Sequence, residues 1–243
     1  MPLYRDVGVV LRTHKLGESD RIITLMTQDS GKVRAVAKGV RKTSSRFGSR
    51  LEPMSHVQLQ LYRGRDLDIV NQVELVEVAA LTRGHLEATT DGLAMCEIVD
   101  QMTHDRSPSP HLYRMLVGAL RQLNVQYSPL LLPALQFRLL EVEGVGPCVH
   151  QCVVCGSAEG LQAFDVSAGG VQCADHRRGT HVSPETLRLL QDVLGGRISA
   201  LLQRTDVPAV AVQELVTLGR NAMEHHLERR IRATSLFEAP QLG

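Results

Sequence analysis

Four side chains that commonly bind metals lie close together in the second half of the chain. Cys152 and Cys155 form a CxxCG turn, and Cys173 and His176 follow after seventeen intervening residues, which gives the pattern C-x2-C-x17-C-x2-H. Two thiolates at this spacing in a tight turn can reach one ion, and Gly156 lets the backbone curl beneath the sulfurs. The spacing therefore predicts a structural Zn²⁺ site. Such a site contributes roughly 10–16 kcal/mol of apparent binding free energy in small peptides, so the metal would decide whether this segment folds.

The neighbouring residues leave the ligand assignment open. Cys148 and His150 lie just upstream, and either could replace one of the four expected ligands. The paired Gly169 and Gly170 predict the tip of a hairpin that returns the second ligand pair to the first. Cys96 lies apart from the cluster on the apolar face of a predicted helix, where we expect it to be a core residue. The alternative for the whole cluster is a set of buried thiols without a metal.

The cysteine count also bears on the compartment. The chain has five cysteines, an odd number, and four of them lie within 26 residues. In a reducing compartment this clustering indicates a metal and not disulfides. The N-terminus lacks the apolar core of a signal peptide, and the sequence has no run of eighteen apolar residues. We therefore expect a cytoplasmic protein.

A catalytic role for the metal finds little support in the sequence. The segment His85-Leu86-Glu87 imitates the first half of the zinc-deaminase motif, but three residues and not two separate Cys148 from Cys152. Four protein ligands would also leave no open position for a water molecule. Phosphate-binding loops of the Walker type and nucleophile elbows are absent from the sequence. We expect a protein that is not an enzyme, with a metal hydrolase or deaminase as the least favoured function.

Residues 1–80 show the alternation of short β-strands. Strands are expected near 7–12, 21–27, 32–38, 56–62 and 67–78, separated by turn residues such as Asp29-Ser30-Gly31. Five short strands in about 80 residues suit a small closed barrel of the OB type. An SH3-like barrel fits this pattern almost as well.

The pattern changes to helices after Leu81. Helical spacing of apolar residues predicts segments near 86–104, 112–123, 128–143, 184–194 and 208–232. The sequence thus predicts an α+β multidomain protein, in which a five-stranded OB-type barrel (1–80) precedes an α-helical domain (81–243). A zinc-knuckle insert at about 146–181 would interrupt the helical domain, with three helices before it and two after it.

A run of positive charge follows the third predicted strand. Seven cations and no acidic residue lie between positions 32 and 50, although the whole chain has a net charge of only +1. The seven are Lys32, Arg34, Lys38, Arg41, Lys42, Arg46 and Arg50. Uncompensated like charges repel, so the run becomes favourable when a polyanion such as a nucleic-acid backbone neutralises it. The alternative is a solvated face, although such faces usually mix both signs.

The run predicts DNA binding through phosphates. Lys38, Arg41, Lys42, Arg46 and Arg50 would make the contacts, with Lys32 and Arg34 behind them. Thr43-Ser44-Ser45, between Gly39 and Gly48, predicts a mobile loop. Phe47 is the one aromatic residue of this loop, with Tyr4 and Tyr62 on predicted strands, so we expect binding dominated by charge and not by base stacking.

Residues 11–53 resemble the N-terminal signature of the RecO family of bacterial DNA repair and recombination mediators. The most specific pieces are Ser19-Asp20-Arg21, Gly31-Lys32, 37–41 and Ser45-Arg46-Phe47. Elsewhere the likeness consists of the order of the parts, CxxCG, and the GGxxC of 169–173. One departure is His176, because the fourth ligand position is often cysteine in the zinc-bearing relatives.

This resemblance implies a function. It implies an OB-fold that binds single- and double-stranded DNA, strand annealing, and help in loading RecA onto DNA coated with single-strand binding protein. It also implies RecR, and in many organisms RecF, as partners, and a nucleoid-associated location. The runner-up function is a zinc-ribbon regulator that reads nucleic acid through its own insert, where Arg177 and Arg178 follow His176.

Overall fold

The structure is a computed structural model, and it describes residues 2–43, 45, 47–77 and 85–235. The chain forms two compact units: residues 1–127 together with 232–243, and residues 128–231. The first two helices belong to the same unit as the barrel, so the units divide at a different point from the expected boundary at 80/81. That boundary, as a division between independently folding domains, stays a prediction.

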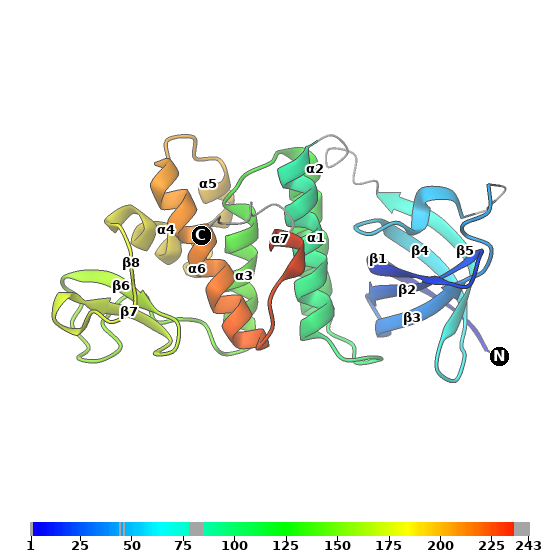
Figure 1. Cartoon of the computed structure of the whole chain (residues 1–243), viewed down its shortest axis with the longest axis horizontal. Coiled ribbons are helices and arrows are strands. Elements are labelled where there is room, and N and C mark those ends of the chain that lie inside the picture. The colour runs from blue at the N-terminus through cyan, green and yellow to red at the C-terminus, as the bar shows by residue number, and fades with distance from the viewer. Residues whose placement is uncertain (1, 44, 46, 78–84, 236–243) are drawn as a thin grey trace, which may run out of the picture. The chain divides into compact units, whose positions relative to one another are not determined.

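Five strands close into a barrel in the first unit (Figure 1). They are β1 (Leu3–Leu16), β2 (Asp20–Thr27), β3 (Gly31–Ala37), β4 (His56–Tyr62) and β5 (Asp68–Glu77). Their order is β1-β2-β3-β5-β4, and β4 pairs back onto β1. All pairs are antiparallel except β3–β5, which is parallel through Ala35↔Asp68 and Val36↔Ile69. The predicted five-stranded barrel is thereby confirmed, and its closure through non-consecutive strands fits the OB type.

Alternate residues of the strands fill the barrel. Val10, Ile23, Leu25 and Ala35 are fully buried members of its core. Because successive side chains of a strand point to opposite faces, the residues between them face outward. The 3-10 helix η1 (Gly48–Leu51) lies between β3 and β4.

Three helices complete the first unit: α1 (Leu86–Met102), α2 (Pro110–Val125) and α7 (Arg232–Ser235). Helix α1 packs on β1, and the Cys96 thiol donates to the Val10 carbonyl oxygen at 3.8 Å. Cys96 is fully buried, as expected of a core residue. Helix α7 docks on α1 because Glu97 accepts hydrogen bonds from the backbone N–H groups of Arg232 (3.1 Å) and Ala233 (2.9 Å).

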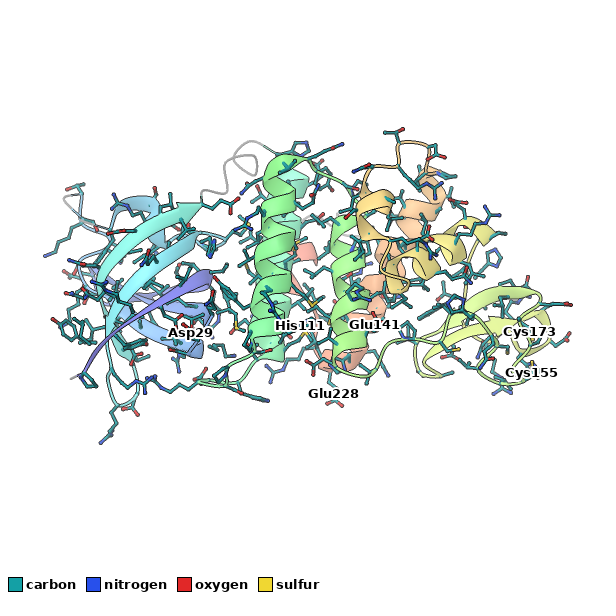
Figure 2. All side chains as sticks on the ribbon, turned by 180° about the vertical axis from the view of Figure 1, so that it is seen from behind. Asp29, His111, Glu141, Cys155, Cys173 and Glu228 are labelled. Carbon is teal, nitrogen blue, oxygen red and sulfur yellow. The ribbon has the colours of Figure 1, made fainter. Side chains whose placement is uncertain are left out.

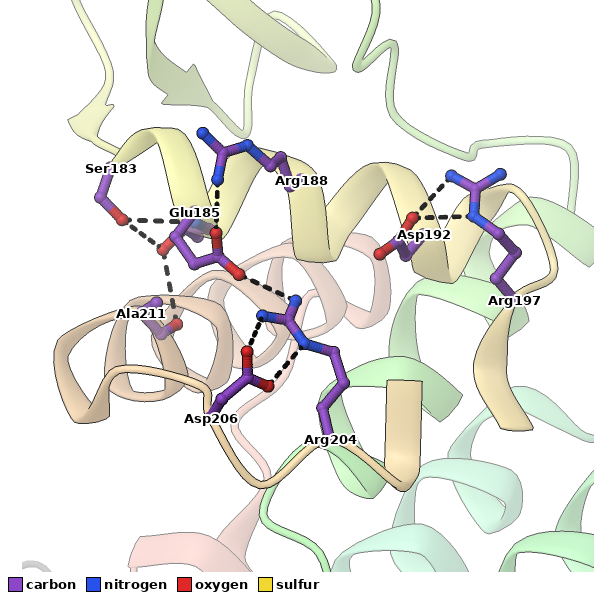
Figure 3. Close-up of polar contacts among 9 residues, drawn as sticks. Ser183, Glu185, Arg188, Asp192, Arg197, Arg204, Asp206 and Ala211 are labelled. Carbon is purple, nitrogen blue, oxygen red and sulfur yellow. Dashed lines mark hydrogen bonds and ion pairs between the residues drawn. The ribbon is translucent and has the colours of Figure 1, made fainter. Parts of the chain in front are cut away.

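The second unit combines helices with a small sheet. Its helices are α3 (Leu131–Val142), α4 (Pro184–Leu194), α5 (Ile198–Leu202) and α6 (Ala209–Leu227). The sheet, of order β7-β6-β8, contains β6 (Leu161–Asp165), β7 (Gly170–Cys173) and β8 (Thr180–His181), and the 3-10 helix η2 (Ala174–His176) follows β7. Helices α3 and α6 pack closely at Gly219, where an added Cβ would lie 2.5 Å from Oε1 of Gln136. An ion pair ties α4 to the α5–α6 connection, with Nη1 of Arg204 2.8 Å from Oε1 of Glu185 (Figure 3).

The helix prediction was right in position and wrong in number. Ser183 caps α4 as expected, accepting from the Thr186 N–H at 3.3 Å. The expectation of two helices after the insert was wrong, because α4, α5, α6 and α7 follow it. The last predicted helix is split, since Glu228 adopts a left-handed conformation (φ 52°) that ends α6. Within the part of the chain that the structure describes, no helix is both long and apolar enough to cross a membrane.

Candidate nucleic-acid interface and metal centre

Cations gather on the outer surface of β3 and on the turn that follows it. Arg34, Lys38, Arg41 and Lys42 are all exposed. No carboxylate of the described residues forms an ion pair with any of these four. Their charge is therefore available to an external anion. Arg46, which we also expected to bind DNA, lies outside the described residues, and Arg50 is exposed on η1, where its N–H donates to the Phe47 carbonyl oxygen at 3.2 Å.

The turn after β3 is held by the connection between β1 and β2. Oδ1 of Asp20 accepts the Gly39 N–H at 2.7 Å, and the Arg41 N–H donates to the Ser19 carbonyl oxygen at 3.0 Å. Within the turn, the Lys42 N–H donates to the Gly39 carbonyl oxygen at 3.1 Å. The pKa of Asp20 is lowered, mainly by the hydrogen bond from Gly39 and then by the Ser19 hydroxyl. These hydrogen bonds hold residues 39–42 in place, in the part of the chain where the sequence predicted the start of a mobile loop.

The second half of the loop is fixed by apolar anchors. Phe47 and Leu51 are each 1% exposed and belong to the barrel core. Phe47 therefore cannot stack on a nucleobase, so it is not a stacking residue of the loop as the sequence suggested. Its spacing of four residues from Leu51 was the signal in the sequence, because this spacing puts both side chains on one face of a helical turn.

Lys32 differs from the other cations because it is neutralised inside the protein. Its Nζ lies 2.7 Å from the carbonyl oxygen of Asp100 and 3.3 Å from Oδ1 of the same residue. Both side chains are nearly buried, 12% and 14% exposed respectively. Nε of Arg12 lies 2.5 Å from Oδ2 of Asp100, so one carboxylate on α1 holds two cations of the barrel. No local sequence pattern indicated this partner, because Asp100 lies 68 residues from Lys32.

The four predicted metal ligands come together in the second unit. One ligand atom each from Cys152, Cys155, Cys173 and His176 lies within 4.8 Å of all the others. The sulfurs of Cys155 and Cys173 are 3.8 Å apart, and Sγ of Cys173 is 3.2 Å from Nδ1 of His176. Figure 2 labels Cys155 and Cys173, which lie close together in this module. Tetrahedral Zn²⁺ with bonds of about 2.3 Å to sulfur separates two thiolates by about 3.8 Å. The donor set and its spacing thus fit a tetrahedral metal ion.

Two local features bring the ligands together. Gly156 adopts φ 75° and donates its N–H to the Cys152 carbonyl oxygen at 2.8 Å, which forms the predicted turn beneath the sulfurs. The predicted hairpin is also present as β6 and β7, and at Gly170 an added Cβ would lie 2.3 Å from the Cys148 carbonyl oxygen. The Val153 N–H donates to the Val171 carbonyl oxygen at 2.9 Å, which fastens the first ligand pair to the strand leading to the second.

The structure bears on whether Cys148 or His150 replaces one of the four metal ligands. Cys148 and His150 are not part of the ligand group, and the Cys148 thiol donates to the Gln151 carbonyl oxygen at 3.4 Å. In the ligand group, burial raises the pKa of the Cys152 thiol, but backbone N–H groups, first that of Cys173, outweigh it and bring the pKa to about 6. A lowered thiol pKa favours the thiolate, which is the form that binds metals.

Sequence reasoning missed one residue of this module. Gln172 lies on β7 directly before the ligand Cys173 and is 2% exposed. Its Nε2 donates to Oδ2 of Asp165 at 3.1 Å, and its Oε1 accepts the N–H groups of Arg178 (2.8 Å) and Gly179 (3.2 Å). Gln172 therefore ties the hairpin to the segment that follows His176. The sequence shows only a glutamine next to the ligand Cys173, which reveals neither its burial nor its partners.

Comparison with known proteins covers both units. The family model "Recombination protein O N terminal" matches residues 1–79, and "Recombination protein O C terminal" matches residues 83–235. A DNA repair protein RecO of a Nocardioides species is 42% identical over 247 aligned positions, covering 97% of this chain and 99% of that protein. A DNA repair protein RecO of Cutibacterium acnes is 40% identical over 248, covering 98% and 100%. The barrel with its basic turn and the helical unit with its ligand group are thus matched along nearly their whole length, and the chain belongs to the RecO family of DNA repair proteins.

Proposed function

We propose that this chain is a recombination mediator that binds single- and double-stranded DNA and anneals complementary strands. It would also assist the loading of RecA onto DNA coated with single-strand binding protein. The observation that carries the proposal is the set of exposed cations on a turn held in place by the barrel. Arg34, Lys38, Arg41 and Lys42 have no ion-pair partner among the described residues. Several unpaired cations held close together attract a polyanion more strongly than they attract single small anions.

The mechanism is electrostatic. Each neutralised phosphate of a single strand contributes about −0.7 to the slope of log affinity against log salt, so about five contacts give roughly −3.5. Lys38, Arg41, Lys42, Arg46 and Arg50 are the five proposed contacts, with Arg34 behind them. Lys32 is excluded from them because Asp100 already neutralises it. Annealing follows because a cationic surface that holds two backbones side by side lowers their mutual repulsion.

The metal in this proposal is Zn²⁺, and its role is structural. Cys152, Cys155, Cys173 and His176 would hold it, and it would supply the cross-link that keeps the hairpin and the CxxCG turn together. Four protein ligands occupy a tetrahedral ion fully, which argues for a structural and not a catalytic site. The chain is therefore proposed to be a binding protein and not an enzyme.

The partners follow from family membership. DNA, RecR and single-strand binding protein are proposed as direct partners, RecF as a possible one, and RecA as an indirect one. Acting on chromosomal DNA, the protein would be found in the cytoplasm at the nucleoid. The two relatives are named DNA repair proteins, which supports the DNA partner more strongly than the protein partners.

A pair of double variants tests the proposal. Arg41→Ala with Lys42→Ala removes two exposed cations of the turn, so the salt slope for a single strand should become shallower by about 1.4 and annealing should slow. Fluorescence anisotropy with a labelled oligonucleotide measures the first effect, and annealing of complementary strands, with and without single-strand binding protein, measures the second. A slope equal to that of the wild type would contradict the proposal.

The second double variant tests the alternative function. Arg177 and Arg178 are exposed beside the ligand His176, which is the observation that favours a zinc-ribbon regulator. Under our proposal, Arg177→Ala with Arg178→Ala leaves the salt slope and annealing near their wild-type values. If this variant loses DNA affinity while the variant at Arg41 and Lys42 keeps it, the insert is the DNA-binding element.

A further inference from the structure

The outer face of β1, β2 and β3 is divided into three rows of cross-strand neighbours. The strand register places Val9, Met26 and Lys32 in one row, Arg12, Thr24 and Arg34 in the next, and His14, Ile22 and Val36 in the third. Core residues such as Val10, Ile23 and Ala35 alternate with these positions, which sets all three rows on the outside of the barrel.

Helix α1 covers only part of this face. In the first row Val9 and Met26 are fully buried, and Lys32 is bound to Asp100 of α1. In the third row His14 is exposed, whereas Ile22 and Val36 are partly exposed. The face of β2 and β3 is where OB-folds bind oligonucleotides. Here α1 covers the first row of that face and leaves the third row at least partly exposed; these are called the closed end and the open end.

The middle row forms the boundary. The guanidinium of Arg12 contacts both Asp100 and Nε2 of His14, so it links the closed end to the open end and orients the imidazole. Thr24 is fully buried in the same row, and its hydroxyl has no hydrogen-bond partner among the described residues. Arg34 is exposed and without an ion pair.

We infer that the open end of this face is a subsite for an unpaired nucleobase of a bound single strand. The inference rests on the proposed DNA binding and deepens it, and it adds a stacking contact to binding that the sequence predicted to be dominated by charge. His14 supplies a ring face, Ile22 and Val36 supply an apolar floor, and Arg34 supplies a planar cation beside it. Bases stack on aromatic rings, and contact arginine guanidinium groups, with little sequence preference.

Charge complementarity selects the occupant. Lys38 lies two residues after Val36, just past the end of β3, and the exposed cations Arg41 and Lys42 follow in the turn. These cations attract a phosphate backbone, while the floor of the subsite is apolar. A single strand presents both a backbone and free bases to such a surface. A duplex presents its backbone but keeps its bases stacked inside. The turn therefore serves both forms of DNA, and the open face serves single strands alone.

Variants at His14 test this division in the full-length chain. An oligothymidine strand and a blunt duplex of equal length are titrated at one fixed salt concentration. His14→Ala should weaken single-strand binding about fivefold to tenfold, which is the lower part of the range measured for base stacking, and should leave duplex binding unchanged. His14→Phe keeps a ring without a charge and should retain single-strand binding. His111→Ala, at an exposed histidine of α2, is the matched control and should change neither.

The outcomes separate this inference from the proposed function. Loss of single-strand affinity in His14→Ala that His14→Phe restores supports the subsite. Equal loss for both DNA forms, no loss in His14→Ala, or loss in both His14 variants overturns it. The variant at Arg41 and Lys42 should weaken both forms of DNA in the same assay. If it does so while the His14 variants bind like the wild type, the proposed function stands and only the subsite falls; a wild type that binds neither form removes both.

Discussion

The basic turn and the cysteine module obtain their order from different sources. At the turn, Asp20 binds the Gly39 N–H, and Phe47 fills the barrel core. In the module, β7 has four residues and β8 has two, and four ligand atoms converge within 4.8 Å. Strands this short stabilise little by themselves. The turn thus depends on the fold of the barrel, and the module depends on its ligands.

This difference means that DNA binding and metal binding should depend on separate parts of the fold. If the cations are positioned by the barrel, DNA binding should survive the loss of the metal. If the cysteine module positioned the cations, loss of the metal would abolish DNA binding as well. The following experiments act on one region at a time, beginning with the largest expected change.

Cys152→Ser should have the largest effect, and it should be confined to the module. Loss of one ligand removes much of an apparent metal-binding free energy on the order of 10 kcal/mol. We expect bound zinc to be lost and amide hydrogens at 148–181 to exchange rapidly, whereas the salt slope of DNA binding stays as in the wild type. Metal analysis and hydrogen exchange measure these changes. Cys148→Ser is the control, since Cys148 lies outside the ligand group; full protection in Cys152→Ser would show that the module does not need its metal.

Phe47→Ala should have the next largest effect, and it should be confined to the barrel. Removing a fully buried aromatic ring costs about 3–5 kcal/mol of unfolding free energy, so denaturant unfolding of the first unit should shift strongly. Phe47→Leu keeps much of the buried apolar volume and should restore most of the stability and DNA affinity. If Phe47→Leu folds well but loses single-strand affinity, the ring contacts DNA after all.

Asp100→Asn should act on both stability and DNA binding, but less strongly. Lys32 would lose the charge of its partner while remaining nearly buried, and because the pair keeps some solvent and a second bond to the Asp100 carbonyl oxygen, we expect a loss of about 1–3 kcal/mol. Release of Arg12, whose side chain is already partly exposed, should steepen the single-strand salt slope by about 0.7. Asp66→Asn, in an exposed ion pair with Arg65, is the control and should change neither quantity. An unchanged slope in Asp100→Asn would mean that Asp100 does not restrict the cationic surface.

The sequence predicted most of what depends on neighbouring residues. The ligand set followed from two short motifs, Cys152 to Cys155 and Cys173 to His176, joined by a hairpin with a glycine tip. The barrel strands followed from alternation, and Ser183 marked the start of α4. In each case the residues that decide the structure lie within one turn or one hairpin of each other.

Contacts between distant segments were not predictable in this way. The pairing of Lys32 with Asp100, and the docking of α1 on β1, depend on how elements pack after they form. Phe47 was assigned to a loop by its basic surroundings, although burial in the barrel decides its role. Helix α5, with five residues, is too short to show a helical period. Local pattern therefore found the charged residues, and only the packing showed which of them are already neutralised.

Asp20→Asn should give the smallest change and the most direct view of how the turn is ordered. The pKa of Asp20 is lowered in the folded protein, so its stabilising contribution is fully present above its unfolded pKa and is lost as the pH falls through the folded value. We expect the Gly39 and Arg41 amides of the wild type to lose protection on acidification through this range, after correction for the intrinsic rate. In Asp20→Asn the protection should already be low at neutral pH, because a neutral amide accepts a weaker hydrogen bond than a carboxylate. Glu18→Gln, at an exposed acid of the same connection, should behave like the wild type. Protection that survives in Asp20→Asn would mean that the apolar anchors alone hold the cations, and the turn would then resemble the module in depending on a single kind of restraint.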